Sequence, residues 1–522
     1  MGDMLLRFYR TKIKKEHKVA FVATFIVAML IHMYKFSNTL QNHDSVFNFY
    51  ADQNLLPSGR WALSFFAGFS SYFDLPWLLG VVSCFMIALT TVVIVALFDM
   101  KNPVLIVLTG ALIAASPATT ETFFFLYTAD AYMISMFLSA IAVYLSRMGE
   151  SRPLRWIVSG VCICVSCGIY QAYLAFSFML TACYLIVQLL DNRCRRAECF
   201  KWLLMQLIMY VVSLAAFYII WKMCMHFSGM TPESYQGIDQ VGTMNIGLLF
   251  HGFISSAKIA IQFFLGWNVF KNGFTVYAVL NLVFLCFFAI SLIVAVIKSD
   301  IWKRKWAMLL LLLCVAAMVP LVGIWNFTSD SIGYRPMMLQ SLTLLFVFAA
   351  LLFETWTGKI FKNTAALLLV AVIINNSVLA NISYYHMNLC QQRTYAECAE
   401  LMLYIHNYQR EYDVEKIAFI GDRSADLAWE MFDEKTGDIT GAGKAQFLTM
   451  LLETNLLSDH RHCVAFLNST YGLGLIGANE EKLTELSALP GVQELGCWPT
   501  ENCITVVDDI LVIKLADVLP VS

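Results

Sequence analysis

The chain has 522 residues, of which 59% are hydrophobic and only 14% are charged. Soluble domains carry nearer a quarter of charged residues, so this composition is typical of a membrane protein. The formal net charge is −2, and the basic residues occur in short clusters between apolar runs rather than on one continuous face. This distribution argues against nucleic acid as a partner and predicts contact with membrane lipid.

The first apolar run begins at Val19 and follows a basic cluster within residues 7–18. Such a start can mark a secretory signal, but residues 36–39 offer no cleavage site made of small residues. We therefore expect an uncleaved first helix whose N-terminus lies in the cytoplasm.

Apolar runs of about 20 residues, the length that crosses a bilayer, recur through the first 384 residues. Residues 156–190 are too long for one crossing and have basic residues at both flanks, so we expect two crossings with an outer turn at 168–171. The pattern predicts about eleven transmembrane helices, at 19–36, 76–98, 103–117, 123–146, 155–169, 170–190, 202–221, 275–297, 306–325, 337–356 and 364–384.

The distribution of Lys and Arg orients these spans. The segments predicted to lie inside hold 20 of these residues, and the outer segments hold Lys35, Arg60, Lys222, Lys258, Lys271 and Arg335. Because cytoplasmic loops carry the excess of positive charge, this asymmetry supports the proposed topology. The apolar segment 247–266 is not counted as a span, because His251 and Lys258 lie within it. We expect it to lie on the outer surface or to dip partly into the membrane; if it crossed, the C-terminal region would lie in the cytoplasm.

The character of the chain changes near residue 385, where charges become frequent. The runs 414–420 and 510–515 predict strands, and 445–456 and 480–489 predict helices, the second ended by Pro490. We therefore expect a mainly α fold: a multi-span membrane domain over 1–384 and a small α/β domain over 385–522. Eleven crossings from a cytoplasmic start put the second domain outside. Its Cys497 and Cys503 fit either a disulfide or two thiols.

The polar loop after the first span is the candidate catalytic segment. Ionisable groups at a membrane boundary are costly and usually functional. We therefore expect this loop, which holds Asp44, Asp52 and Arg60, to be the catalytic loop of a membrane enzyme, with His43 and Asp52 as substrate-binding candidates. A helix cap or a solvated loop carboxylate is the alternative for Asp44, and a structural role is the alternative for Asp52. The sequence has no Walker A motif, no G-x-G-x-x-G after a strand and no H-E-x-x-H, which argues against nucleotide and zinc chemistry.

Four short features occur in order along the chain: Asp44, the Ser-Gly-Arg-Trp of 58–61, the Tyr-Gln-Ala-Tyr of 170–173 and the Tyr-Arg-Pro of 334–336. Together they resemble the bacterial Gtr-type glucosyltransferases of the C-type (GT-C) membrane superfamily, over about residues 15–385. The resemblance implies a GT-C-like protein of the bacterial cytoplasmic (inner) membrane. It also implies transfer of a hexose, with glucose favoured, from a polyprenyl-phosphate donor to a cell-surface glycan such as O-antigen, on the outer side. It further implies inversion with Asp44 as general base.

A transfer of this kind needs cations that stabilise the departing phosphate. Arg335 suits this role, because a guanidinium can hold phosphate oxygens bidentately; the alternative is an anchor at the membrane interface. Arg60 is the second candidate. Tyr170 and Gln171, at a tight turn, are expected to line the cavity.

Glu121 and Asp130 flank the second outer loop, 119–132. They could bind acceptor sugars or, with Asp44, a divalent cation; solvation of a loop is the alternative interpretation. No other cofactor is indicated.

Two other functions fit the hydropathy. A lipid-linked-glycan transporter would be expected to carry internal repeats and broken helices, and we find neither in the sequence. A polysaccharide polymerase or ligase fits equally well, and only the order of the short motifs favours transfer. The outer domain could recognise the acceptor or be purely structural.

Overall fold

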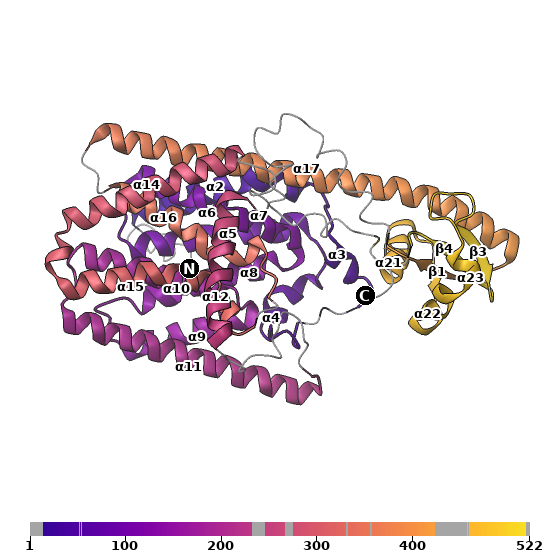
Figure 1. Cartoon of the computed structure of the whole chain (residues 1–522), viewed down its shortest axis with the longest axis horizontal. Helices are drawn as coiled ribbons and strands as arrows, with labels where there is room; N and C mark the ends of the chain where they lie inside the picture. The colour runs from indigo at the N-terminus through magenta and orange to yellow at the C-terminus, as the bar shows by residue number, and fades with distance from the viewer. Residues whose placement is uncertain are drawn as a thin grey trace, which may run out of the picture.

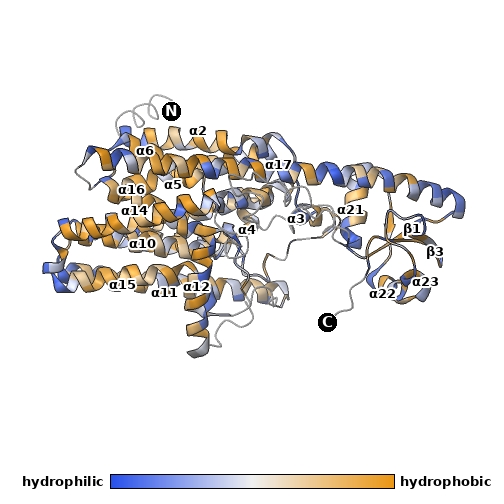
Figure 2. Cartoon of the chain, turned by 45° about the horizontal axis from the view of Figure 1, so that its top comes forward, coloured by the Kyte–Doolittle hydropathy of each residue, from blue (hydrophilic) through white to orange (hydrophobic). Residues whose placement is uncertain are grey.

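The structure is a computed structural model, and it describes residues 14–51, 53, 55–231, 246–266, 275–329, 332–354, 358–422, 457 and 459–517. Long helices lie side by side in a bundle, and a small α/β domain stands beyond one end of it (Figure 1). Apolar residues cover the bundle helices, whereas polar residues gather at the helix ends and on the small domain (Figure 2). This partition is that of a polytopic helical membrane protein.

The bundle contains every predicted span as a helix. Within the described residues, ten helices are long and apolar enough to cross a membrane, and α6 and α9 are shorter apolar helices. In chain order the bundle helices are α2 (Lys15–Ser37), α5 (Pro76–Leu97), α6 (Pro103–Ala114), α7 (Pro117–Thr122), α8 (Leu126–Leu145), α9 (Pro153–Ile169), α10 (Tyr173–Leu190), α11 (Arg196–Ser228), α12 (Ile246–Leu265), α14 (Val276–Lys298), α15 (Lys305–Val322), α16 (Gln340–Glu354) and α17 (Lys359–Tyr412). The predicted turn at 168–171 is confirmed by the break between α9 and α10.

Short elements connect these helices. They are α3 (His43–Phe47), α4 (Leu63–Ala67), η1 (Gly68–Ser70), η2 (Phe123–Phe125), η4 (Ile301–Lys303), η5 (Ile324–Phe327) and η6 (Pro336–Leu339). Helix starts follow local chemistry: proline occupies the first turn of α5, α6, α7 and α9, where its missing N–H costs nothing. Gly229, with φ of 66°, ends α11 in the left-handed conformation.

The interior of the bundle forms around α8 and α10. α5 packs against α2 and α8, α8 packs against α9, and α10 packs against α15 and α16. The helices α11, α14 and α15 instead expose large apolar side chains, including Leu207, Val211, Ile290 and Leu309. Such surfaces are suited to lipid.

The helix α12 was predicted to lie on the outer surface. By length and composition it is one of the candidate spans. It nevertheless runs across the direction of α11 and α15 (Figure 2), with His251 and Lys258 both exposed and Phe263 and Phe264 buried. The location of α12 on the membrane surface therefore stays a prediction.

The last span continues into the small domain. α17 is one helix across the boundary expected at residue 385 (Figure 1), and its Cys398, Leu401 and Ile405 belong to the core of the small domain. The change in composition there marks a change of environment and not the end of a helix.

The small domain is α/β, as predicted. Its sheet has the order β2-β1-β4-β3, in which β1 pairs in parallel with β2 and β4, and β3 is antiparallel to β4. The strands are β1 (Lys416–Ile420), β2 (Ile476–Gly477), β3 (Ile504–Val507) and β4 (Ile510–Lys514), and the helices are α21 (His460–Tyr471), α22 (Glu480–Ala488) and α23 (Pro490–Gln493). Both predicted strands and the helix at 480–489 are confirmed, whereas the helix predicted at 445–456 lies outside the described residues. Cys497 and Cys503 are thiols.

Candidate active site

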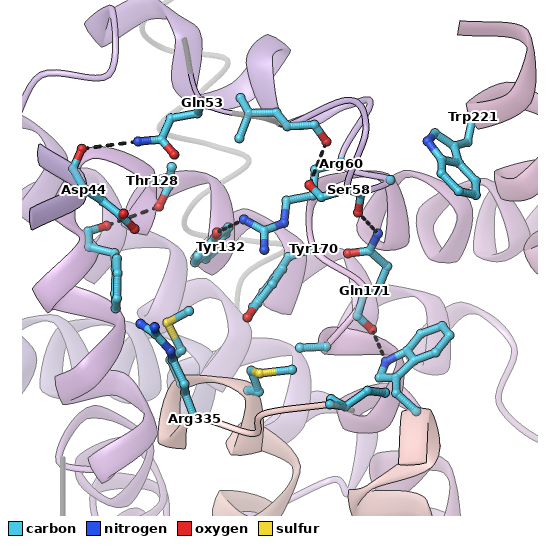
Figure 3. Close-up of a pocket in the computed structure, with 18 of the residues that line it drawn as sticks. Asp44, Gln53, Ser58, Arg60, Thr128, Tyr132, Tyr170, Gln171, Trp221 and Arg335 are labelled. Atoms are coloured by element: carbon cyan, nitrogen blue, oxygen red, sulfur yellow. Dashed lines mark hydrogen bonds between the residues drawn. The ribbon is translucent and has the colours of Figure 1, made fainter. Parts of the chain in front are cut away.

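A cavity of about 420 Å³ lies at the end of the bundle that faces the small domain. Its walls come from segments far apart in sequence: α3 and the loop after it, the start of α8, the α9–α10 turn, the end of α11, and the η5–η6 region. The polar residues among those that line it are His43, Asp44, Gln53, Ser58, Arg60, Tyr127, Thr128, Tyr132, Tyr170, Gln171, Tyr218, Trp221, Trp325, Thr328 and Arg335. Figure 3 shows ten of the lining residues by label.

Asp44 is held at the first turn of α3. The side chain of Asn42 caps this helix by accepting the backbone N–H of Ser45 at 2.9 Å, and its amide donates to the carbonyl of Phe124 at 2.9 Å. Because Asn42 is fully buried, the cap also ties α3 to η2. Asp44 therefore lies at a fixed point of the cavity wall.

The carboxylate of Asp44 has two close partners. The hydroxyl of Tyr127 donates to Oδ2 at 3.2 Å, and His43 Nε2 lies 3.1 Å from Oδ1. Burial raises the pKa of Asp44, but the hydrogen bond and charge of His43, the charge of Arg335 and the Tyr127 hydroxyl outweigh it, so the pKa is below the ordinary value. About a third of the side chain is exposed. Asp44 is thus an ionised, accessible acceptor of protons.

A second layer of polar residues supports α3. Ser45 Oγ donates to Asp74 Oδ2 at 2.7 Å, and Asp74 interacts electrostatically with Lys35 at the end of α2. Lys35 is fully buried and donates to the carbonyl of Leu40. Burial raises the pKa of Asp74, and the charge of Lys35 opposes this effect. Asp74 and Lys35 together hold the segment between α2 and α3 through their bonds to Ser45 and Leu40.

Arg335 reaches the same cavity from the chain segment before η6 (Figure 3). Its guanidinium carbon lies 5.5 Å from the centre of the Phe125 ring. The segment is anchored by Glu121, whose Oε2 accepts the backbone N–H of Met337 at 2.6 Å. The structure therefore brings Asp44 and Arg335, 291 residues apart in sequence, to one cavity.

Arg60 forms a second cationic point in the cavity. Its Nη1 donates to the hydroxyl of Tyr132 at 3.3 Å, and its guanidinium carbon lies 5.0 Å from the centre of the Tyr170 ring (Figure 3). The two tyrosine rings stack with centroids 4.4 Å apart. Arg60 is thus held by an aromatic pair while it faces the cavity.

The loop that carries Arg60 is hydrogen-bonded to two distant segments, the α9–α10 turn and helix α11. Gln171 Nε2 donates to the carbonyl of Ser58 at 2.9 Å, and Trp221 Nε1 donates to that of Leu56 at 2.8 Å. Gly59 has φ of 83°, and a Cβ at this position would collide with Gln171 Nε2. A glycine is therefore required where the loop meets the α9–α10 turn.

Three predicted substrate-binding residues are not among the described lining residues. Glu121 is fully buried and holds the segment of Arg335 instead. Asp130 is fully buried in α8. Asp52 lies outside the described residues.

Several cavity residues were not singled out from the sequence. Tyr127 lies in the predicted second outer loop, 119–132, and Trp325 lies at the end of a predicted span. Trp325 Nε1 donates to the carbonyl of Gln171 at 3.2 Å and closes the cavity on that side. An aromatic residue at a membrane interface usually marks a lipid contact, so these roles could not be predicted from the residue types.

A divalent cation was suggested for Asp44, Glu121 and Asp130. Within the described ranges, no group of three or more His, Cys, Asp or Glu side chains is arranged to hold a metal ion. What the cavity offers chemically is one ionised carboxylate, two guanidinium groups and an aromatic wall. Such a set can accept a proton from a hydroxyl and stabilise an anionic leaving group in the same space.

Comparison with known protein families gives a match. Residues 33–354 match the family model described as "Glucosyl transferase GtrII". The matched segment begins near the end of α2 and ends with α16, so it contains every residue that lines the cavity but not α17 or the small domain. No curated protein and no solved structure matches the chain.

Proposed function

Because this chain belongs to the GtrII glucosyl transferase family, we propose that its cavity transfers glucose from a polyprenyl-phosphate donor to a hydroxyl of a cell-surface glycan. The observation that carries the proposal is that Asp44 and Arg335 line the same cavity. The family match also favours transfer over the polymerase, ligase and transporter alternatives.

In the proposed reaction the acceptor oxygen attacks the anomeric carbon of glucose. The bond between that carbon and the phosphate oxygen breaks, and the electron pair leaves with the polyprenyl phosphate. Asp44 takes the acceptor proton as general base, so atoms and charges balance. Since attack and departure occur on opposite faces in one step, the anomeric configuration inverts.

The electrostatics of the cavity support these roles. The pKa of Asp44 is lowered, so the group is in its basic form at neutral pH. Arg335 is the phosphate-binding candidate because a guanidinium can hold two phosphate oxygens at once, and its charge acts on Asp44 at the other side of the cavity. Arg60, held against Tyr132 and Tyr170, is the second phosphate or sugar contact.

The position of the cavity suits a lipid-borne substrate. Phe217, Tyr218 and Trp221, near the end of α11, line it, and α11 exposes large apolar side chains along the rest of its length. A polyprenyl chain can lie against this surface while its phosphate reaches the arginines. The excess of Lys and Arg in the opposite loops supports an outward-facing cavity in the bacterial cytoplasmic membrane, with a cytoplasmic N-terminus and an external small domain.

A donor comparison tests the proposal. Purified protein in lipid nanodiscs is incubated with an acceptor polysaccharide and either polyprenyl-phosphate glucose, other polyprenyl-phosphate hexoses or UDP-glucose. The proposal predicts transfer of glucose from the lipid donor alone, with inverted configuration by NMR of the product. Transfer from UDP-glucose only, or retention of configuration, would contradict it.

A further inference from the structure

A second cavity, of about 600 Å³, lies between the loop after α3 and the small domain. One wall is formed by Phe49 and Tyr50, and the other by α21 and β2 of the small domain. Its side chains include Phe49, Tyr50, Arg461, Asn468 and Ser469. Nothing in the proposed transfer step uses this space.

The two cavities share a wall of aromatic side chains. Phe47 lines the first cavity and Tyr50 lines the second, and their ring centroids are 5.1 Å apart. His462 of α21 packs against this wall, since its Nδ1 lies 2.9 Å from the Tyr50 hydroxyl and its Nε2 lies 3.1 Å from the carbonyl of His43. A ligand in the second cavity would thus lie one aromatic layer from Asp44.

The chemistry of the second cavity is mixed. Phe49 is 38% exposed and offers an apolar face, and the guanidinium carbon of Arg461 lies 5.7 Å from the centre of the Tyr50 ring. Arg461 also pairs with Glu480 at 3.3 Å, which holds it at the rim. Aromatic faces together with a few fixed polar groups suit a sugar, whose faces are apolar and whose edges carry hydroxyls. The small domain is also more polar than the bundle (Figure 2), which does not suit a lipid chain.

We propose that the second cavity binds the acceptor polysaccharide at sugars next to the one that carries the reacting hydroxyl. This inference rests on the proposed function and names the part of the enzyme that selects its acceptor. The α21 wall lies beyond the segment 33–354 that matches the family, whereas the Phe49 and Tyr50 wall lies within it. Acceptor choice is therefore set by this chain's own small domain.

Filling the cavity tests the proposal. Ser469 is exposed and lines the cavity, so Ser469→Trp places a ring in it, whereas Thr470→Trp puts the same ring on the next residue of α21, which is exposed and not a lining residue. The acceptor probes are the surface polysaccharide of a source strain that lacks this protein and the single repeat released from it. Ser469→Trp should raise the KM for the polysaccharide about tenfold, leave kcat within about twofold and leave the single repeat unaffected, as expected for lost uniform binding.

Thr470→Trp should match the wild type with both probes. The proposal would be overturned if Ser469→Trp and the wild type had the same KM for the polysaccharide. It would also be overturned if Ser469→Trp raised the KM for the polysaccharide and for the single repeat equally. Thermal unfolding of each variant serves as the control for an intact fold.

Binding measured without donor separates this proposal from the proposed function. The full-length protein should bind the polysaccharide more tightly than the single repeat, and Ser469→Trp should abolish the difference. If the wild type transfers glucose to the single repeat but shows no preference for the polysaccharide, the acceptor site is overturned and the transferase remains. If the wild type binds the polysaccharide but transfers nothing from polyprenyl-phosphate glucose, the proposed function fails and the acceptor site remains.

Discussion

The carboxylate of Glu121 accepts the backbone N–H of Met337 at 2.6 Å, across 216 residues of sequence. This bond fixes the start of η6, two residues after Arg335. It gives Glu121 a positioning role in place of the sugar contact expected from its loop, because a fully buried carboxylate cannot reach a ligand in the cavity.

Replacing Glu121 should therefore act through Arg335. Glu121→Ala leaves the Met337 N–H without its acceptor and should cost about 1–3 kcal/mol in the free energy of unfolding. Glu121→Gln keeps an acceptor oxygen and should retain most of the stability. Thermal unfolding measures the first effect, and kcat for transfer from polyprenyl-phosphate glucose should fall in Glu121→Ala and recover in Glu121→Gln. An equal loss in both variants would point to a need for the charge itself.

Arg335→Ala should lower kcat about 10²- to 10³-fold, as expected when one group that stabilises transition-state charge is removed. Arg335→Lys should recover part of this loss, because an ammonium keeps the charge but not the bidentate geometry. Arg152→Ala, at an exposed arginine before α9, serves as the control and should behave as the wild type. Single-turnover transfer measures all three, and full activity of Arg335→Ala would remove its assignment.

The pH dependence follows from the lowered pKa of Asp44. Because the folded-state pKa lies below 3.8, the base stays ionised, and kcat/KM should show no acid limb from Asp44 between neutral pH and about pH 5. Because the pKa of Asp44 is lower in the folded protein than in the unfolded chain, ionised Asp44 stabilises the fold at pH values above the unfolded-state pKa. This stabilisation is lost as the pH falls through the folded-state pKa.

Two variants test that electrostatic origin. His43→Ala and Tyr127→Phe each remove a partner that lowers the pKa, so the acid limb of kcat/KM should move to higher pH in both, and further in His43→Ala. A pH–rate profile that is the same in all three proteins would show that Asp44 does not govern the rate.

Gly59→Ala should destabilise the loop that carries Arg60. The substitution combines a positive φ with a collision against Gln171, so a loss of about 1–2 kcal/mol is expected together with reduced transfer. Gly149→Ala is the matched control, because Gly149 has φ of 79° but no atom lies within 4 Å of its added Cβ. Backbone strain should lower the free energy of unfolding in both variants, whereas glucose transfer should fall only in Gly59→Ala.

The sequence predicts the helical fold well because bilayer thickness imposes a length and a composition on each span. It predicts less of what depends on packing. α17 has no glycine or proline between 359 and 412, which indicates one uninterrupted helix, yet the fall in hydropathy near 385 suggested a domain boundary. Hydropathy reports the environment of a segment, and the backbone of α17 continues from one environment to the other.

In the candidate site, too, some residues could be predicted from the sequence and others could not. Asp44, Arg60, Gln171 and Arg335 could be found because ionisable groups at a membrane boundary are usually functional and because short motifs resemble those of a known family, and the structure brings them to one cavity. The contacts of Tyr127 and Glu121 could not be predicted, because each partner is more than 80 residues away in the chain. Sequence alone gives no distance between such segments.

The central claim is that Asp44 is the base for a sugar carried on a lipid phosphate, and single-turnover transfer by Asp44→Asn tests it most directly. Asp99→Asn is the control. Asp99 lies just after the C-terminal end of α5 and does not line the cavity, and its φ of 51° is one that asparagine tolerates. With polyprenyl-phosphate glucose in nanodiscs, Asp44→Asn should bind donor normally and transfer about 10²- to 10⁴-fold more slowly, while Asp99→Asn matches the wild type. Transfer by Asp44→Asn at the wild-type rate would contradict the claim.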